Sequence, residues 1–431
     1  MIALQPAPPD RVPLDLRQQL LRQINHWEGA AERLDDFEST ATPAAWATLE
    51  RYVGVTMREE LKSARAQLRR EASLVRTAFN AVRSRADVAR VADLLAVFRN
   101  RYLQTELLVD FYVDAVRARG SEEVGAQLRA CDTMATRAIS TALDQLGHKT
   151  PPLLTYFKPG RGASILRIGT KLWDGSLSRV AAIKLTYHNR FRTTALFHEC
   201  GHQVAGITGW NQDFAQALRG KLPGTGGLAG EAAGEFGAWA SEMAADAFAF
   251  AHSGYAAVVA LSDVVAGRGA EVFRYLPGDP HPISYLRVQL GVEMCRRFYG
   301  MGPWDELAAA WKEFYPTGAA PDFAGELVAA LTPLLPRVVD LALLTPLPCF
   351  HGRRLADIIN PLRVAPSALR LMERNAGGSA YVSSHWIWTE CLRLTALSGL
   401  RYATDPERGA AILKQQEDMM IRLGNMSQET P

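Results

Sequence analysis

The strongest constraint on the fold is a run of apolar residues spaced three and four positions apart, starting at Trp46. The run continues through Leu49, Val53, Met57, Leu61, Ala64, Leu68, Ala72, Val75, Phe79 and Val82. Because an α-helix has 3.6 residues per turn, this spacing places the apolar side chains on one face, while arginine and glutamate occupy the other. The pattern predicts one long amphipathic helix that buries its apolar face.

Two further helices are expected before residue 150. One covers roughly residues 86–119 and ends at Gly120, and the next begins after Ser121, where Glu122 and Glu123 form an acidic first turn. The three helices predict an antiparallel bundle or hairpin in region 1–150. An apolar helical face of this kind belongs to a core more often than it binds a partner, so we interpret it as core.

The character of the sequence changes after Pro151 and Pro152. Short β-like runs occupy residues 153–157, 163–168 and 180–187, and a helix containing His198 is expected directly after them. The glycine-rich stretch 222–237 is expected to be a mobile loop. These patterns predict a mainly α protein with a small β-sheet (α+β). We expect three regions, 1–150, a catalytic region 151–300, and a helical C-terminal region 301–431 that completes the cleft.

Composition and charge narrow the class of protein. A net charge of +3 over 431 residues gives no reason to expect nucleic acid as a partner. The first residues lack the pattern of a secretory signal peptide. The longest run without a charged residue, 247–262, is too short to span a bilayer, so no membrane partner is expected. The five cysteines form no C-x-x-C pair. This favours a reducing, cytoplasmic compartment and predicts neither a disulfide framework nor a thiolate zinc site.

The segment from His198 to His202 has the form H-E-x-x-H. On a helix the two histidines lie one turn apart on the same face, so both imidazoles can bind one metal ion. Glu199 lies at the edge of that face and can act as a general base on water in the open position of the metal. Cys200 faces away from the metal and is expected to be a buried filler. The apolar flanks of the motif disfavour the alternative, a chance pair of structural histidines.

A catalytic zinc ion takes three protein ligands and keeps one open position. Glu242 and Asp246 lie four residues apart in an apolar helical segment, where carboxylates without a partner would be costly. The simplest assignment has Glu242 binding zinc and Asp246 orienting a ligand histidine. Glu231 and Glu235 are weaker candidates because they lie in the glycine-rich stretch, and a surface-facing pair at 242 and 246 is the remaining alternative.

H-E-x-x-H followed by E-x-x-A-D resembles the gluzincin metallopeptidases, and among them the family of CAAX-processing and stress-response membrane proteases. That family also carries H-P-x-x-x-x-R, which is present here from His281 to Arg287. The resemblance implies a zincin-like core, with His281 near the substrate side of the zinc and Arg287 anchoring the carboxylates or the bound peptide. A helix that begins at Pro282 also explains the third motif. The chain departs from the family in its expected lack of transmembrane helices and in the short interval between His202 and Glu242.

Together the motifs predict a zinc metallopeptidase, specifically an endopeptidase, with Zn²⁺ as cofactor and a peptide or protein as substrate. In this interpretation Glu199 is the general base. Two other functions remain open. One is a protein-interaction module on a zincin core that has lost activity, which the intact motifs disfavour. The other is a zinc hydrolase that acts on a bond other than a peptide bond.

Overall fold

The computed structural model describes residues 12–34, 41–160, 164–166, 180–190, 192–222 and 228–429. Over this part the chain is mainly helical and contains one three-stranded sheet. The prediction of a mainly α protein with a small sheet is therefore confirmed. Two compact units make up the chain, one reaching Gly120 and the other starting at Ser121.

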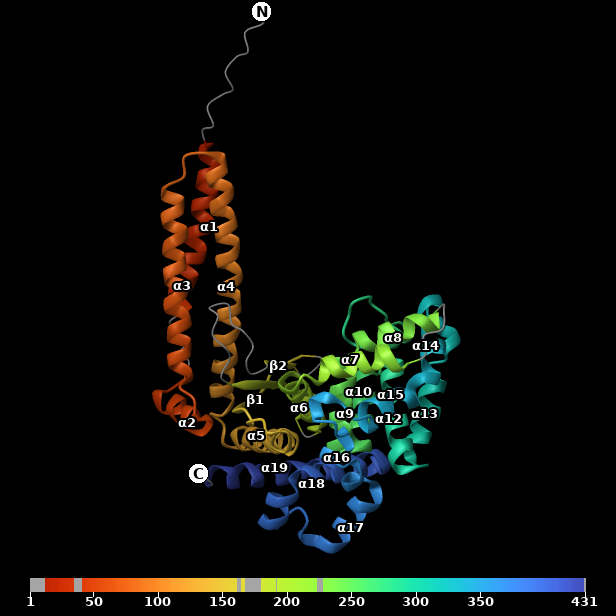
Figure 1. Ribbon diagram of the computed structural model, residues 1–431. Coiled ribbons are helices and arrows are strands. Elements are labelled where there is room, and N and C mark those ends of the chain that lie inside the picture. The colour runs from red at the N-terminus through yellow and green to blue at the C-terminus, as the bar shows by residue number, and fades with distance from the viewer. Residues whose placement is uncertain are drawn as a thin grey trace, which may run out of the picture. The chain divides into compact units, whose positions relative to one another are not determined.

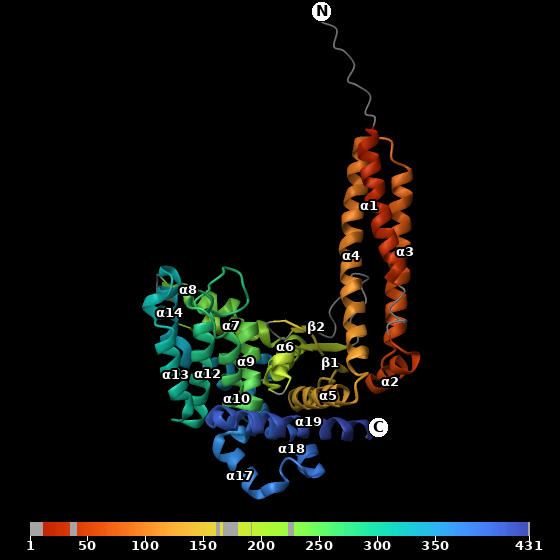
Figure 2. The ribbon, with the colours of Figure 1, turned by 180° about the vertical axis from the view of Figure 1, so that it is seen from behind.

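The first unit is a helical bundle. Its helices are α1 (Leu14–Arg33), α2 (Pro43–Val53), α3 (Met57–Asn80) and α4 (Arg85–Ala118). Helices α1, α3 and α4 run alongside one another, and α3 and α4 form the expected antiparallel pair (Figure 1, Figure 2). The apolar stripe of α3 supplies its share of a core made of Leu20, Ile24, Ala31, Leu68, Ala72, Val75, Phe79, Val82, Val88, Val91, Leu95, Phe98 and Tyr102.

The single long helix expected from Trp46 to Val82 is in fact two helices. Gly54 ends α2 in the left-handed conformation, with φ 72°, and α3 begins at Met57. Glycine adopts this conformation without steric cost, which makes it a common helix terminator. The step of four from Val53 to Met57 preserves the apolar spacing across the break, so the periodicity does not reveal it.

The second unit holds the sheet and the remaining helices. Its α-helices are α5 (Glu122–Leu143), α6 (Thr194–Thr208), α7 (Trp210–Lys221), α8 (Leu228–Ala238), α9 (Ala240–Ser253), α10 (Tyr255–Val265), α11 (Gly269–Val272), α12 (Ser284–Tyr299), α13 (Pro303–Phe314), α14 (Asp322–Leu331), α15 (Leu335–Val339), α16 (Leu355–Ile358), α17 (Pro366–Ala376), α18 (Ser384–Thr404) and α19 (Gly409–Glu429). Its strands are β1 (Leu153–Phe157), β2 (Ser164–Leu166) and β3 (Ala181–Leu185).

The sheet has the order β1-β3-β2, with β1 parallel and β2 antiparallel to β3. All three strands fall within the predicted runs, although residues 163 and 167–168 lie outside the described part. Strand β1 is buried along its whole length and packs against α5. There the Asp132 carboxylate accepts hydrogen bonds from the backbone N–H and the hydroxyl of Thr155, both at 2.7 Å. Strand β3 leads into α6, which carries the H-E-x-x-H motif.

The unit boundaries differ from the expected regions 1–150, 151–300 and 301–431. Helix α5 packs against α19, α6 and β1, so it belongs to the second unit, and both ribbon views show α19 alongside α5 (Figure 1, Figure 2). The C-terminal helices share that unit because α18 packs against α9 and α10, while α13 packs against α12. Periodicity identifies a helix but does not identify the partner against which it packs.

The stretch 222–237, expected to be a loop, is largely helical. Helix α8 covers Leu228–Ala238, while residues 223–227 lie outside the described part. Gly237 is buried, and a Cβ atom there would approach the Arg219 side chain of α7 to 2.6 Å. The missing side chain at Gly237 leaves room for the Arg219 side chain of α7. The glycine-rich composition therefore suggested a loop where the chain forms a helix.

One helical run has the length and apolarity of a membrane span, which by itself is weak evidence for one. The run is Phe323–Leu344, with a mean hydropathy of 1.8, and half of its most apolar window is buried inside the protein. The core helix of a soluble protein passes the same test. No other helix among the described residues does so. The charged residues Arg337 and Asp340 interrupt the run in the sequence, which concealed it.

Candidate metal centre

Helix α6 presents His198 and His202 from consecutive turns of one face. Their rings meet edge to face with centroids 4.8 Å apart. The opposite face of α6 is buried through residues that include Leu196, Phe197 and Cys200. Cys200 is fully buried and its Sγ lies 3.9 Å from the Ala135 carbonyl oxygen, so it points into the core as predicted.

Glu242 on α9 faces both histidines. Its Oε2 lies 3.3 Å from His198 Nε2, and its Oε1 lies 3.1 Å from His202 Nε2. One ligand atom from each of the three residues can be chosen so that all lie within 4.8 Å of one another. Two ligands held about 2.0–2.2 Å from a tetrahedral zinc ion stand roughly 3.3–3.6 Å apart. The donor types are those of a catalytic zinc site, and the three atoms are close enough together to hold one metal ion.

The second nitrogen of each imidazole also has a partner. His198 Nδ1 lies 2.9 Å from Asp246 Oδ1, and His202 Nδ1 lies 3.3 Å from Ser241 Oγ. A hydrogen bond at Nδ1 fixes the ring orientation and leaves Nε2 free for a metal. The structure thus places Asp246 where the sequence analysis put it. It adds Ser241, which sequence reasoning missed because a lone serine in an alanine-rich helix gives no signal.

Gly201, inside the motif, sets the distance between α6 and α9. A Cβ atom at this position would lie 2.7 Å from Ala245 Cα and 2.9 Å from Phe248 Cβ. Real side-chain carbons do not approach so closely, so only glycine lets the two helices pack at this separation. This contact is what carries Glu242, one turn from Ala245 on α9, to the histidines.

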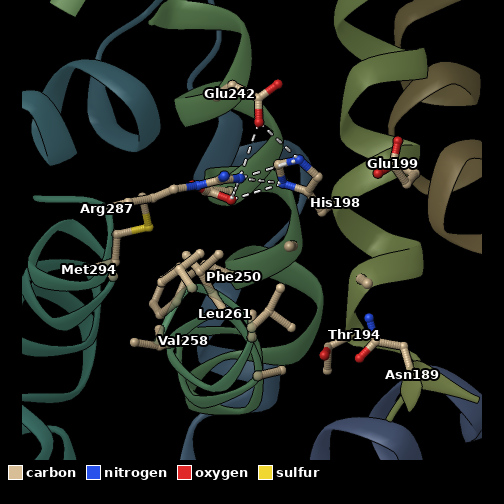
Figure 3. Close-up of a pocket in the computed structure, with 18 of the residues that line it drawn as sticks. Asn189, Thr194, His198, Glu199, Glu242, Phe250, Val258, Leu261, Arg287 and Met294 are labelled. Atoms are coloured by element: carbon tan, nitrogen blue, oxygen red, sulfur yellow. Dashed lines mark hydrogen bonds and ion pairs between the residues drawn. The ribbon is translucent and has the colours of Figure 1, made fainter. Parts of the chain in front are cut away.

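Arg287 on α12 supplies the positive charge in the cluster. Its guanidinium donates from Nε and Nη2 to the two oxygens of Asp246 at 2.6 and 2.8 Å, and its Nη2 lies 3.2 Å from Glu242 Oε2. The same Nη2 lies 3.4 Å from both ring nitrogens of His198. All four side chains are largely buried. The predicted anchoring contact between Arg287 and the carboxylates is thus present in the geometry (Figure 3).

Burial and charge act in opposite directions on the pKa values of the cluster. Burial disfavours the charged form of His198, but hydrogen bonds to Asp246 and Glu242 raise its pKa to about 9. Burial would raise the pKa of Asp246, yet the neighbouring Arg287 charge lowers it to about 2. The pKa of Glu242 is likewise held below its usual range, against the effect of burial, by His198, His202 and Arg287. Both carboxylates are therefore ionised at neutral pH, as a cation site requires.

Glu199 differs from the other two carboxylates. Its side chain lines the same cavity and is buried, but it lies on α6 outside the network of dashed lines in Figure 3. Burial raises its pKa, and this effect outweighs the opposing charges of His198 and His202. A carboxyl group with a raised pKa that is not needed as a ligand suits proton transfer.

His281 lies at the exposed edge of the cluster. Its side chain is 61% exposed, and its Nε2 is 3.9 Å from Glu242 Oε1. The nearby Asp279 carboxylate holds its Nδ1 at 2.7 Å and also accepts from its backbone N–H at 3.0 Å. Helix α12 begins at Ser284, just after Pro282, so the proline precedes the helix rather than starting it. The histidine therefore borders the open side of the site.

Comparisons with protein-family models, with curated proteins and with solved structures found no match. The interpretation of the site therefore depends on its own geometry. Of the competing carboxylates, Glu235 accepts a hydrogen bond from the Tyr275 hydroxyl at 2.9 Å and is not part of the cluster. The side chain of Glu231 lies outside the described part.

A cavity of about 420 Å³ opens beside the cluster, within the usual size of a ligand site. One part of it is lined by the three candidate ligands together with Glu199 and Arg287. Apolar side chains of α9, α10 and α12 line another part (Figure 3). The apolar lining includes Phe250, Val258, Leu261, Val264, Val265 and Met294.

Removing Arg287 should destabilise the metal-free protein strongly. In Arg287→Met two buried carboxylates lose their main cationic partner, and the free energy of unfolding should fall by about 3–5 kcal/mol. Saturating zinc should recover part of this loss, because a bound cation offsets the same charges. Chemical denaturation with and without zinc measures both effects. Arg296→Met is the matched control. Arg296 lies on the same helix in a half-exposed pair with Asp305, so its loss should cost at most about 1 kcal/mol. Equal losses in both variants would contradict the charge-balancing role of Arg287.

Proposed function

We propose that the chain is a cytoplasmic zinc-dependent endopeptidase with a gluzincin-like site. The proposal rests above all on one arrangement: two imidazole Nε2 atoms and the Glu242 carboxylate converge, while the Glu199 carboxylate is buried in the adjoining cavity. The first three groups match the number of protein ligands that a catalytic zinc ion takes. The fourth provides a proton acceptor that the metal does not occupy.

In this proposal each residue has a distinct task. Zinc, when bound by His198, His202 and Glu242, acidifies water and polarises a substrate carbonyl as a Lewis acid. Glu199 accepts the proton of the attacking water as the new carbon–oxygen bond forms. It then passes this proton to the leaving amine as the carbon–nitrogen bond breaks. The raised pKa of Glu199 favours the first of these transfers, because a carboxylate with a higher pKa is a stronger proton acceptor.

Three further residues keep the site in its working geometry. Asp246 and Ser241 hold the two imidazole rings through Nδ1. Arg287 donates from Nε and Nη2 to the two carboxylate oxygens of Asp246, and its charge offsets the repulsion between the two ionised carboxylates. His281, exposed at the edge of the cluster, is in position to contact the substrate as it enters.

The direct test is a cleavage screen on a peptide mixture prepared from a whole proteome. We expect the zinc-loaded protein to generate new N-termini within the peptides, and removal of zinc with a chelator to abolish them. Mass spectrometry of the products identifies each cleaved bond. Activity on esters or other non-peptide amides with no peptide cleavage would reject the peptidase and retain the hydrolase.

A further inference from the structure

Two polar side chains in the cavity have no part in the proposed chemistry. Asn189 ends a short 3-10 turn, Tyr187–Asn189, and Thr194 is the first residue of α6. Both are more than nine-tenths buried and both line the cavity. The hydroxyl of Thr194 has no hydrogen-bond partner within the described part of the chain. The side-chain amide of Asn189 likewise makes no hydrogen bond to another described residue.

The two groups lie together, away from the metal ligands. Thr194 precedes His198 by four residues, which is just over one helical turn or about 6 Å along α6. Figure 3 shows the Asn189 amide beside Thr194, on the side of the cavity opposite Glu242. An aromatic side chain spans a distance of this size. A substrate group that enters at the metal can therefore reach the polar pair.

The surroundings of the pair are uncharged. The ionisable groups that line the cavity all belong to the metal centre and its margin, and the wall facing the pair is apolar; these groups are His198, Glu199, His202, Glu242, Asp246, His281 and Arg287. Val258 and Leu261 come from α10 and Met294 from α12 (Figure 3). A charged side chain would lose its hydration here without gaining a partner. An apolar body would fit this wall.

A buried hydroxyl without a partner costs roughly the free energy of a lost hydrogen bond, so it is retained at a net cost in the free protein. A ligand with a matching polar atom removes that cost. We propose that this cavity is the specificity pocket of the enzyme. It takes a side chain with an apolar body and an uncharged polar tip, as in tyrosine, and Asn189 and Thr194 bind the tip. This inference rests on the proposed function for the position of the scissile bond next to the pocket.

Binding of matched peptides tests the proposal without turnover. The peptides differ only in one central residue, which is Tyr, Phe, Lys or Glu, and calorimetry measures their affinity for the zinc-loaded Glu199→Gln protein. We expect Tyr to bind best, Phe roughly 3- to 10-fold more weakly, as for the loss of one hydrogen bond, and the charged residues more weakly still. In Thr194→Val and Asn189→Leu backgrounds, the preference for Tyr over Phe should disappear while Phe binding is retained.

The chain offers a close control. Thr193 is also fully buried with an unpaired hydroxyl. It lines only a small second cavity, which Thr194 borders as well, and it does not line the cavity beside the metal centre. In the free protein both Thr193→Val and Thr194→Val should keep or raise the melting temperature, because each removes an unpaired buried hydroxyl. Only Thr194→Val should change the preference for Tyr.

The outcomes separate the pocket from the peptidase. Equal binding of Tyr and Phe peptides, absence of binding, or an equal loss for every peptide in Thr194→Val would overturn the pocket; the last result would assign the pair to the peptide backbone. Selective Tyr binding without cleavage by the wild type would uphold the pocket and reject the peptidase. Cleavage without side-chain preference would uphold the peptidase and reject the pocket.

Discussion

Replacing Glu199 with glutamine should lower turnover by roughly 10²–10⁴ while leaving zinc content and melting temperature unchanged. The amide has nearly the same size as the carboxyl group, so packing in this buried position is kept. It cannot accept the proton of the attacking water or return one to the leaving amine. The metal is unaffected because Glu199 lies outside the His198, His202 and Glu242 set.

The measurement is cleavage of a peptide identified in the proteome screen, with zinc content and thermal unfolding measured on the same samples. Glu293→Gln is a matched control, since Glu293 pairs with Arg296 on α12 and does not line the cavity. That variant should retain wild-type turnover. A protein-interaction module would not respond to Glu199→Gln, because its partner surface and metal site are the same in both proteins. Equal function of wild type and Glu199→Gln would therefore establish the interaction module in place of the enzyme.

One zinc ion per chain should bind to the wild type, and alanine at His198, His202 or Glu242 should abolish stoichiometric binding. Each of these variants removes one of three protein ligands, and two ligands do not hold zinc against a chelator. Asp246→Ala should retain zinc with affinity lowered roughly 10- to 100-fold, because the imidazole remains but loses the group that orients it. Competition with a chromogenic chelator measures these affinities.

Glu235→Ala is the control for this series, since its carboxylate is bound to Tyr275 and not to the histidines. It should keep wild-type affinity for zinc. Loss of zinc from Glu235→Ala with retention in Glu242→Ala would show that the third ligand is Glu235 on α8 and not Glu242. Full zinc occupancy in a protein lacking both histidines would show that zinc does not bind at this site.

Local patterns were sufficient for most of the fold. Steps of three and four predicted the buried face of α3, and the β-like run 153–157 coincides with β1. Predictions from these local patterns were wrong where one residue type has two structural roles. Glycine terminates α2 at Gly54, but at Gly237 it allows α8 to pack against α7. Nothing in the local sequence distinguishes these cases, because the difference lies in the neighbouring helix.

In the candidate site, too, spacing within one helix could be read from the sequence, whereas contacts between helices could not. The metal-binding set follows from spacing within single helices, because His198 and His202, or Glu242 and Asp246, must share a face when they are four residues apart. Ser241, Asn189 and Thr194 carry no such signal. Each is an ordinary polar residue whose importance comes from what the tertiary fold places opposite it. The sequence also does not show which segments pack together, such as α5 with α19, α6 and β1.

The close contact at Gly201 has a consequence for how such a site can evolve. The positions of the candidate ligands are set by two backbones that approach closely where a side chain is missing, and no described residue of the joining segment belongs to the His198, His202 and Glu242 cluster. Helices α7 and α8 can therefore change in length or sequence without moving these three side chains, provided that α6 and α9 still meet at this glycine. A short interval between His202 and Glu242 is then no obstacle to a gluzincin-like centre. Besides the candidate ligands themselves, the residue that must be kept is Gly201, because a side chain there would push α6 and α9 apart.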